Sequence, residues 1–342
     1  MKTLFLKTST VNRRQSIAIA SQLIREGKLV AFPTETVYGL GANVYNTHAI
    51  RNIFRAKGRP QDNPLIVHIR SIDQVALLVR SIPIMFFALA KRFFPGPLTL
   101  VMKKSTIIPD IVTAGLSTVA IRMPDHPIAR QLLKHSGVPI VAPSANLSGK
   151  PSPTSAEHVR DDLDGKIDAI LDGGRCKIGV ESTVLDITHG IPVILRPGGV
   201  TREEIEDVLQ CRVRVARTTQ KRPSSPGMKY THYAPDAEVI LFEGERPAVL
   251  HAMKQAAFRL KKKHVVVGIM ASADFECSFK GLNFFSLGKS GAFSAAQLLY
   301  DGFRTLDRKG ISVILCQGFT DTHIGSALMN RMRKAAWRRI RV

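Results

Sequence analysis

Two short apolar runs frame the segment in which polar side chains are most concentrated. Residues 29–32 and 65–69 have the length and β-branched content of buried strands. Between them, glycine and proline interrupt a polar stretch. Because binding residues are often carried by loops between rigid elements, we expect the functional site around residues 28–70.

A helix is predicted inside this segment. Asn46 or Thr47 can cap its start, and apolar residues at 50, 53, 54 and 56 follow a helical period. Gly58 ends it, so Lys57 and Arg59 are presented from a stiff turn. Such a pair suits an anionic ligand. Cations near a helix C-terminus are also common as solvated charges, and this alternative stays open.

Further polar groups surround the ends of the two predicted strands. They are Thr34, Glu35, Thr36, Asn63 and His68. Open α/β sheets bind ligands at such strand ends. The residue types therefore favour a binding site, although each of them could equally be structural.

A second polar loop follows an apolar strand predicted at residues 139–142. It reads PSANLSGKPSPT, and Ser144, Asn146, Ser148 and Ser152 supply short hydrogen-bonding side chains. This composition is typical of an ordinary surface loop. Its place directly after a buried strand also favours a ligand-binding role.

The first 217 residues contain further α/β elements. Helices are predicted at residues 16–26, 126–136 and 203–209, and a helix interrupted at Pro83 at residues 72–94. Strands are predicted at residues 98–102, 118–123, 168–172, 182–187, 192–196 and 212–216. Arg122, Ser182, Thr183 and Arg196 fall near the ends of these strands, where a guanidinium group is well suited to bind phosphate or carboxylate.

A second domain is predicted after a linker rich in Ser, Pro, Gly and Lys. We place the first domain at residues 1–217, the linker at 218–236 and the second domain at 237–342. Strands at 238–242, 264–270 and 311–316 alternate with helices at 249–262, 292–307 and 324–340, which predicts a three-layer α/β domain with a parallel sheet. The last helix would carry a basic face, either solvated or in contact with RNA. Its cations are Arg331, Arg333, Lys334, Arg338, Arg339 and Arg341.

Composition and the absence of certain motifs exclude several kinds of protein. The 342 residues have a formal charge of +22, which predicts attraction to polyanions such as RNA. No apolar stretch reaches membrane-spanning length and the N-terminus lacks a secretory signal, so a soluble cytoplasmic protein is expected. The four cysteines are widely spaced, which indicates neither a disulfide framework nor a zinc site. Gly39-Leu40-Gly41 lacks the third glycine of a dinucleotide fingerprint, and no P-loop occurs.

The ordered motifs resemble the YrdC-like threonylcarbamoyl-AMP synthases in their two-domain form. They are FPTETVYGLGAN, AKGRPQDNPL, FPGPLT, TVAIRMP, APSAN with SGKPSPT, GVEST, LRPGG, SPGMKYTHYAP and ALMNRMRKA. One departure is His323-Ile324-Gly325, where related chains tend to carry two glycines before the MNR string. The resemblance implies a YrdC-like twisted mixed-sheet domain followed by a smaller Rossmann-like three-layer α/β domain.

The resemblance also implies a reaction and its partners. Members of the family condense L-threonine, bicarbonate and ATP to L-threonylcarbamoyl-AMP and pyrophosphate. Mg²⁺ would enter with ATP, without protein metal ligands. A separate threonylcarbamoyl transferase would use the product to modify a tRNA adenosine next to the anticodon, and tRNA contact through the basic surface is expected.

Site residues follow from the matching motifs. The ATP-binding residues implied are Lys57, Arg59, Gln61, Thr118, Ser144, Asn146, Ser152, Arg196 and Tyr230. Lys57, Arg59 and Arg196 would stabilise charge during catalysis. The implied threonine-binding residues are Thr34, His68, Arg122, Ala142 and Ser182, with Asn63 and Thr183 as further lining residues. Tyr230, His232 and Tyr233 are expected to form a lid that protects a labile carbamate.

Two other functions remain compatible with the sequence. A double-stranded RNA-binding or ribosome-assembly module would explain the charge, but it leaves the polar loops after buried strands without a role. A carbamoyl-adenylate synthase using carbamoyl phosphate would need the same first domain. Such chains carry additional domains, for which 342 residues leave no room.

Overall fold

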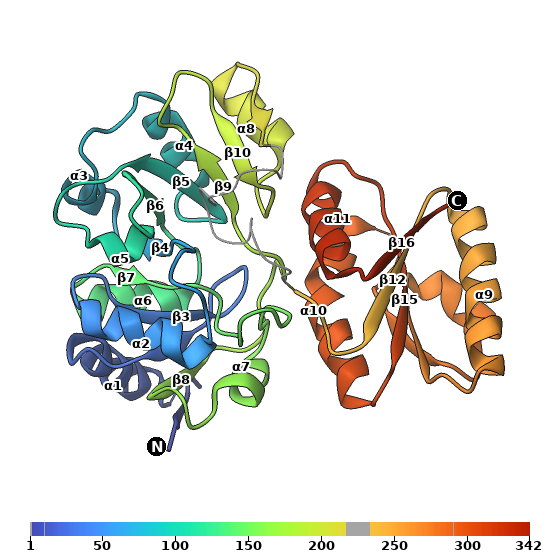
Figure 1. The fold of residues 1–342 in the computed structure, drawn as a ribbon. Coiled ribbons are helices and arrows are strands. Elements are labelled where there is room, and N and C mark those ends of the chain that lie inside the picture. The colour runs from blue at the N-terminus through green and yellow to red at the C-terminus, as the bar shows by residue number, and fades with distance from the viewer. Residues whose placement is uncertain (1, 10, 217–232, 290) are drawn as a thin grey trace. The chain divides into compact units, whose positions relative to one another are not determined.

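The computed structural model describes residues 2–9, 11–216, 233–289 and 291–342. The chain forms two compact units (Figure 1). The first contains the described residues of Met1–Ser148 and Ser152–Tyr230, and the second those of Gly149–Pro151 and Thr231–Val342. Most of the predicted linker, residues 218–232, lies outside the described residues, so its bounds stay a prediction.

The first unit is built on an 11-stranded mixed sheet ordered β1-β8-β2-β3-β7-β4-β6-β5-β9-β10-β11. Its strands are β1 (Leu4–Lys7), β2 (Val30–Phe32), β3 (Gly39–Asn43), β4 (Ile66–His68), β5 (Leu98–Lys103), β6 (Thr118–Arg122), β7 (Ile140–Val141), β8 (Ala169–Asp172), β9 (Thr183–Asp186), β10 (Val193–Arg196) and β11 (Arg214–Val215). The predicted mixed-sheet α/β fold is confirmed. The apolar runs that frame the polar segment are strands β2 and β4.

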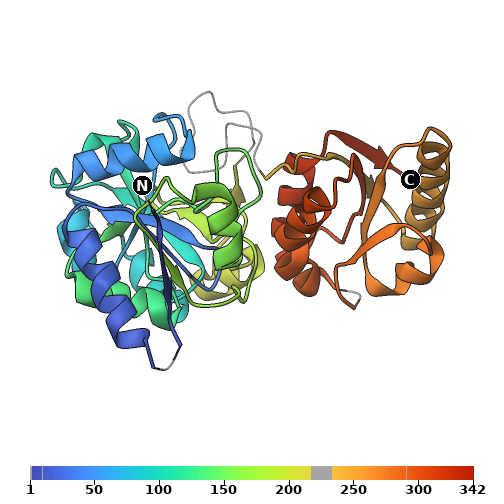
Figure 2. The ribbon, with the colours of Figure 1, turned by 90° about the horizontal axis from the view of Figure 1, so that it is seen from below.

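Helices cover the two faces of this sheet unequally. They are α1 (Arg13–Arg25), α2 (Thr47–Lys57), η1 (Ile72–Gln74), α3 (Val75–Leu78), α4 (Met85–Phe93), α5 (Asp110–Thr113), α6 (Pro127–Ser136), α7 (Ala156–Leu163) and α8 (Arg202–Leu209). Helices α2, α4, α7 and α8 pack on one face. Helices α1 and α6 pack on the other, against β2, β7 and β8. Figure 2 shows α1 and α2 on opposite sides of the sheet.

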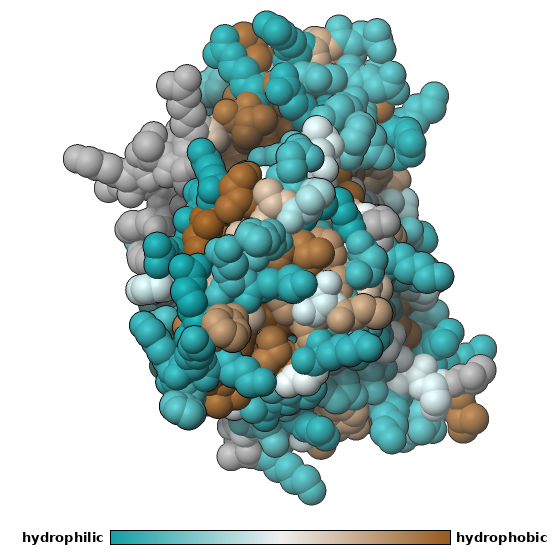
Figure 3. Space-filling view, turned by 90° about the vertical axis from the view of Figure 1, so that its right-hand side faces the viewer, coloured by the Kyte–Doolittle hydropathy of each residue, from teal (hydrophilic) through white to brown (hydrophobic). Residues whose placement is uncertain are grey.

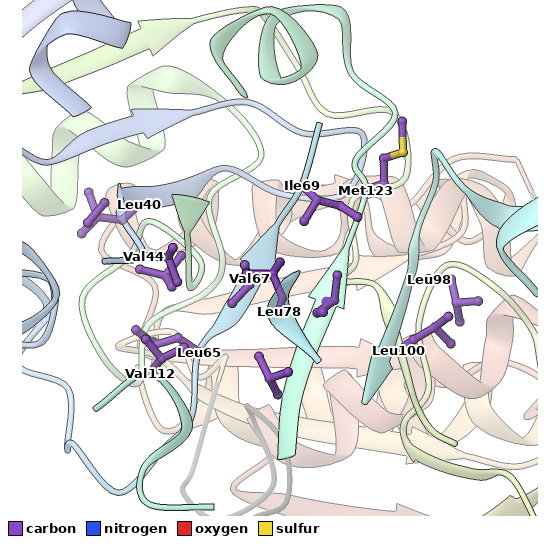
Figure 4. Close-up of a cluster of buried hydrophobic side chains, with 14 of the residues drawn as sticks. Leu40, Val44, Leu65, Val67, Ile69, Leu78, Leu98, Leu100, Val112 and Met123 are labelled. Carbon is purple, nitrogen blue, oxygen red and sulfur yellow. The ribbon is translucent and has the colours of Figure 1, made fainter. Parts of the chain in front are cut away.

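The main hydrophobic core lies on the face to which α2, α3, α4, α5, α7 and α8 contribute. Val67 and Leu100 contribute to it from adjacent parts of the sheet, and Val112 contributes from α5 (Figure 4). Alternate residues of the same strands point to the opposite face. One face of the sheet is therefore packed with apolar side chains, and part of the opposite face can carry polar ones.

Strand β3 was not predicted from the sequence, because glycine and asparagine are poor strand formers. A Cβ on Gly41 would lie 2.9 Å from Phe32 Cε1 and 2.9 Å from Ile140 Cγ2. Glycine is therefore required for the neighbouring strands to pack closely, although its propensity argues against a strand. Tertiary packing overrides the local preference here.

The second unit is a five-stranded parallel sheet ordered β14-β13-β15-β12-β16. Its elements are β12 (Glu238–Glu243), α9 (Arg246–Lys262), β13 (Val267–Ala271), η2 (Ala273–Phe279), β14 (Asn283–Ser286), α10 (Ala292–Arg308), β15 (Val313–Gln317), α11 (Ile324–Ala335) and β16 (Arg338–Arg341). In Figure 1, α9 lies on one side of this sheet, and α10 and α11 on the other. The predicted three-layer α/β domain is confirmed.

The predicted last helix at residues 324–340 is wrong in its second half. Helix α11 ends at Ala335, and residues 338–341 form the edge strand β16, which pairs with β12. No glycine or proline marks the change, so the local pattern gave no stop signal. Arg331 is also fully buried, with its guanidinium 5.3 Å from the Tyr233 ring. The expected basic helix face does not exist in that form.

None of the helices in the described part of the chain is long and apolar enough to cross a membrane. The four cysteines are unpaired, and Cys176 and Cys316 are buried. Burial raises the pKa of the Cys316 thiol to about 12, so this thiol stays protonated and packs as a small apolar group.

Candidate active site

Three polar loops that are distant in the sequence are joined by backbone hydrogen bonds. They follow β2 (residues 33–38), follow β7 (residues 142–155) and connect β8 to β9 (residues 173–182). The Tyr38 amide donates to the Pro153 carbonyl at 2.8 Å, and the Ile178 amide donates to the Glu35 carbonyl at 2.8 Å. The motifs FPTETVYG, APSAN…SGKPSPT and GVEST therefore meet in one place.

Thr34 organises the first of these loops. Its hydroxyl donates to the Val37 carbonyl at 2.6 Å and accepts from the amides of Thr36 and Val37. The side chain is buried. Its predicted contact with threonine would come in addition to this structural role.

Lys57 links the first predicted loop to the second. Asn46 caps α2 by accepting from the Ala49 amide, and Gly58 ends the helix in the left-handed conformation, with φ 59°. The cap and stop predicted from the sequence are therefore confirmed. Lys57 is 2% exposed, and its Nζ donates to the Ser144 carbonyl at 2.5 Å and to the Asn146 carbonyl. A lysine in this position is not a solvated helix-end charge.

Arg59 is also held within the site region. It is buried, and its Nη2 donates to the carbonyls of Asn63 and Pro64 at 3.3 and 3.2 Å. The predicted ATP residue Gln61 is exposed on the same turn. The loop from Gly58 to Pro64 thus keeps one cation buried and one amide in solvent.

The second polar loop is internally hydrogen-bonded. Ser144 Oγ donates to Asn146 Oδ1 at 2.5 Å. Ser152 is fully buried, and its Oγ donates to Glu181 Oε1 at 2.6 Å. This last bond ties the loop to the residue that precedes Ser182.

Five of the predicted residues share one face of the sheet between β4 and β10. The strand register pairs His68 with Arg122, Arg122 with Thr99, Thr99 with Val184, and Val184 with Arg196. Paired residues point to the same face, and so does every second residue along a strand. His68, Thr118, Arg122, Ser182 and Arg196 therefore lie on this face.

A small apolar cluster lies on this part of the face, and its buried residues all belong to strands. Its members are Ile66, Val101, Ala120, Val184 and Leu195. Thr183 has the opposite orientation and donates to the Val200 carbonyl. Ala142 is buried beside β4, with its amide donating to Ile66 at 2.9 Å.

Arg196 and Ser182 form a connected polar group. Arg196 Nη2 donates to the Ser182 carbonyl at 3.0 Å and to Ser182 Oγ at 3.2 Å. Ser182 Oγ lies 2.8 Å from Thr99 Oγ1. The guanidinium is buried, so its position is fixed by the strand ends rather than by solvent.

Glu35 is a site residue that the predicted set of binding residues does not contain. Its Oε1 lies 2.7 Å from Arg122 Nη2, and the two side chains are 6% and 5% exposed. Neither oxygen of Glu35 makes a well-aligned hydrogen bond to the described residues. The contact is an ion pair without the ideal fork geometry. A carboxylate inside the otherwise uncharged run FPTETVYG was the signal in the sequence.

His68 lies beside Arg122 and is fully enclosed. Burial, and then the neighbouring Arg122 charge, lower the pKa of His68 from 6.5 to about 3. Its ring is therefore neutral near pH 7. Nδ1 of His68 and Oδ1 of Asn63 are buried and lack hydrogen-bond partners among the described residues. Buried polar atoms are nearly always satisfied, so each of these atoms has room in its hydrogen bonding for a bound water or a ligand.

The structure therefore arranges the predicted residues in two connected groups. Lys57, Ser144 and Asn146 gather at the loop after β7, and His68, Arg122, Ser182 and Arg196 at the strand ends. Tyr230 and His232 lie outside the described residues. Tyr233 packs in the second unit, with its ring 5.6 Å from the Tyr300 ring, and its lid role stays a prediction.

Comparisons with known proteins agree over nearly the whole chain. Residues 22–198 match the family model described as Telomere recombination, and residues 200–337 match the one described as Threonylcarbamoyl-AMP synthase, C-terminal domain. The threonylcarbamoyl-AMP synthase of Pyrococcus abyssi is 50% identical over 327 residues, covering 95% of each chain. The Bacillus subtilis protein of the same name is 49% identical over 328 residues, covering 95% of this chain and 94% of its own length.

This chain belongs to the threonylcarbamoyl-AMP synthase family. A solved structure of P. abyssi Sua5 complexed with L-threonine superposes with a TM-score of 0.95 and 48% identity, covering 100% of both chains. The family resemblance stated from the motifs is confirmed. Membership also removes the RNA-binding module without catalysis as an account of the whole chain.

Proposed function

We propose that the chain is an L-threonylcarbamoyladenylate synthase, which joins L-threonine, bicarbonate and ATP. The observation that carries this proposal is the polar face between β4 and β10. There, Arg122 and Arg196 are buried, and Nδ1 of His68, which lies beside Arg122, has no hydrogen-bond partner among the described residues. A buried site with two guanidinium groups suits a carboxylate and a phosphate. Relatives that share about half of the sequence bear the name of this enzyme.

Threonine is proposed to bind at the strand ends. Arg122 would hold the carboxylate through its planar fork. Thr34, His68, Ala142 and Ser182 would surround the rest of the amino acid, with Asn63 nearby. The predicted lining residue Thr183 is left out of this set, because its side chain points to the opposite face of the sheet and donates to the Val200 carbonyl. The complex of P. abyssi Sua5 with L-threonine supports this choice of ligand. A single γ-methyl group supplies only about 1 to 3 kcal/mol, so we expect modest discrimination against serine.

ATP is proposed to bind around the loop after β7. Lys57, Arg59 and Arg196 would neutralise phosphate charge, and Gln61, Thr118, Ser144, Asn146, Ser152 and Tyr230 would complete the contacts. This set contains cations, hydroxyls and amides but no carboxylate. We therefore propose that Mg²⁺ arrives bound to the phosphates of ATP and helps to neutralise them.

The reaction needs orientation and charge stabilisation rather than a protein nucleophile. The threonine amine condenses with bicarbonate to give a carbamate and water. A carbamate oxygen then attacks the α-phosphorus, the bond to the β-phosphate oxygen breaks, and pyrophosphate leaves. Lys57, Arg59 and Arg196 would stabilise the negative charge, and one well-placed donor contributes roughly 2.7 to 4 kcal/mol.

The product is an activated carbamoyl donor, so a transferase must consume it. We propose that a separate threonylcarbamoyl transferase passes the group to a tRNA adenosine next to the anticodon. A cytoplasmic location is proposed with this role, where ATP and tRNA are both present.

Pyrophosphate release with single omissions tests the proposal. Release should need ATP, threonine and bicarbonate together. Lys57→Ala should lower it at least about 100-fold, because a buried donor to phosphate is lost. Lys134→Ala removes an exposed lysine of the same unit and should have no effect. Release that continues without threonine, or that survives in folded Lys57→Ala, would overturn the proposal.

A further inference from the structure

The second unit concentrates its cations on two segments. Residues 246–263 contain six Lys or Arg, and residues 331–342 contain six more, and neither segment has an acidic residue. The first segment is α9 with the residue after it. The second runs from the end of α11 through β16.

These two segments reach the same end of the sheet. Val267 opens β13 and pairs with Val313, which pairs with Glu238 at the start of β12. Trp337 lies at this level, since its amide donates to Val239 at 2.9 Å. Because α9 connects β12 back to β13, the C-terminal turn of α9 also lies at the N-terminal ends of the strands.

Arg338 lies on the sheet face that α9 covers. It alternates with Ile340, which packs against the cluster formed by α9, β12 and β15. Strand β16 is two positions from β15, so about 10 Å separates the two strands. The side chain of Arg338 can therefore extend the surface of α9. Glu238 lies on this face too and reduces its net charge by one.

Several other cations of the two segments are already engaged. Arg333 and Arg339 both bind Glu243, and Arg246 binds Asp274. Arg331 is buried. The cations on the C-terminal half of α9 differ from these. Lys254, Arg259, Lys261, Lys262, Lys263 and Arg338 are exposed, and none makes an ion pair with a carboxylate of the described residues.

Two large aromatic side chains are exposed on the same two segments. Trp337, the only tryptophan of the chain, is 67% exposed, and Phe258 is 61% exposed. Lys262 Nζ lies 4.6 Å from the centre of the Phe258 ring. Figure 3 looks onto the side on which α9 lies in Figure 1, and hydrophilic residues cover most of it, with hydrophobic ones scattered among them.

We propose that these residues form an RNA-binding surface, which we call the α9–β16 surface. It comprises Lys254, Phe258, Arg259, Lys261, Lys262, Lys263, Trp337 and Arg338. Lysine and arginine side chains would neutralise phosphates, and the two aromatic rings would stack on unpaired bases. An acidic protein would use the cations but would leave the rings without a planar partner. An anionic membrane would require a contiguous apolar area rather than two separate rings.

This proposal goes beyond the synthesis of the adenylate, whose reactants include no RNA. It assigns RNA contact to the edge strand and helix of the second unit, whereas the sequence placed it on a continuous C-terminal helix. Release of pyrophosphate should therefore be independent of this surface. The two proposals can fail separately.

Binding of an unmodified tRNA transcript to the full chain tests the surface. Fluorescence anisotropy would be measured over a range of salt concentrations with the triple variant K261Q/K262Q/K263Q. Losing three phosphate contacts should make the slope of log Kobs against log salt shallower by about 2 to 3. The matched control K280Q/K289Q/K309Q removes three exposed lysines of the same unit from other segments, and should bind like the unaltered chain.

Trp337→Ala separates stacking from charge. It should weaken binding about 5- to 150-fold without changing the salt slope, because a stacked base contributes about 1 to 3 kcal/mol. Pyrophosphate release should be unchanged in all of these variants, and unchanged circular dichroism would show that they are folded. Equal losses in the lysine variant and its control would overturn the proposal. So would displacement of the transcript by polyglutamate of equal charge, or tighter binding to anionic vesicles.

Discussion

The Glu35–Arg122 ion pair keeps a guanidinium group in position inside the first unit. Both side chains are almost fully buried, and Arg122 Nε also donates to the Gly96 carbonyl at 3.3 Å. Two buried charges are costly when either lacks its partner. We infer that Glu35 positions Arg122 for the proposed threonine carboxylate.

Replacing Glu35 with glutamine should be strongly destabilising. Glu35→Gln leaves the buried charge of Arg122 uncompensated and should lower the free energy of unfolding by about 3 to 5 kcal/mol. Urea unfolding measures this change. Glu206→Gln is the matched control, because it alters an ion pair with Arg202 whose side chains are 29% and 45% exposed. The control should change stability by at most about 1 kcal/mol. Equal effects of the two variants would contradict the account.

His68 should make the folded state sensitive to acid. Its folded pKa of about 3 lies below the unfolded value of 6.5. Between these values the unfolded chain binds a proton that the folded chain does not, so stability present above about pH 6.5 is lost as pH falls toward 3. His68→Gln should flatten this loss, measured by urea unfolding at about pH 8, 6, 5 and 4. Parallel loss in both proteins would show that other groups are responsible, among them His126, whose pKa burial also lowers.

Residue types near the site could be predicted from the sequence better than their partners could. The cap of α2 and its stop at Gly58 depend on neighbouring residues, so the local pattern contains them. The carbonyls that bind Lys57 are 87 and 89 residues away along the chain. Nothing local to Lys57 indicates whether it is buried, and Glu35 likewise gives no sign that Arg122 is its partner.

At the scale of elements, the start of α11 carries local backbone strain. His323 precedes the helix with φ 49° and ψ −132°, a conformation that favours glycine. This position belongs to the His323-Ile324-Gly325 string, which departs from the expected motif. The departure noted in the sequence thus coincides with an unfavourable backbone conformation.

His323→Gly should stabilise the second unit. Removing the side chain relieves a conformation that costs of order 1 to 3 kcal/mol, and the contacts that His323 makes offset part of the gain. We expect a net rise of about 1 kcal/mol in the free energy of unfolding, read from the urea midpoint. Gly325→Ala is the opposite control. A Cβ there would lie 2.0 Å from the Thr320 carbonyl oxygen, so that variant should be destabilised. Destabilisation by His323→Gly would contradict this reading.

The sequence did not predict the strands whose formation depends on pairing with another strand of the sheet. Strand β3 contains two glycines that make room for Phe32 and Ile140, and β16 continues a run with no helix stop. In both places the strand exists because a neighbouring strand is available to pair with it. By contrast, β2, β4 and α9 have apolar patterns of the expected period, and these elements were found at nearly the predicted positions.

Across the whole molecule, the cations that give the chain its formal charge of +22 have different surroundings and different proposed roles. Some cations are buried at the proposed ATP and threonine sites, some are paired with carboxylates, and others form the α9–β16 surface. Composition alone could predict an affinity for polyanions. It could not separate the cations that would bind small substrates from those that would bind RNA, because that distinction depends on burial and pairing.

In the proposed reaction, the carbon of bicarbonate becomes part of an adenylate that also contains threonine. The most direct measurement is mass spectrometry of the products formed by the full chain from ATP, L-threonine and ¹³C-bicarbonate. We expect an AMP-linked product that has the mass of threonylcarbamoyl-AMP and carries the heavy carbon. An unlabelled adenylate, or a labelled product without threonine, would contradict the proposal.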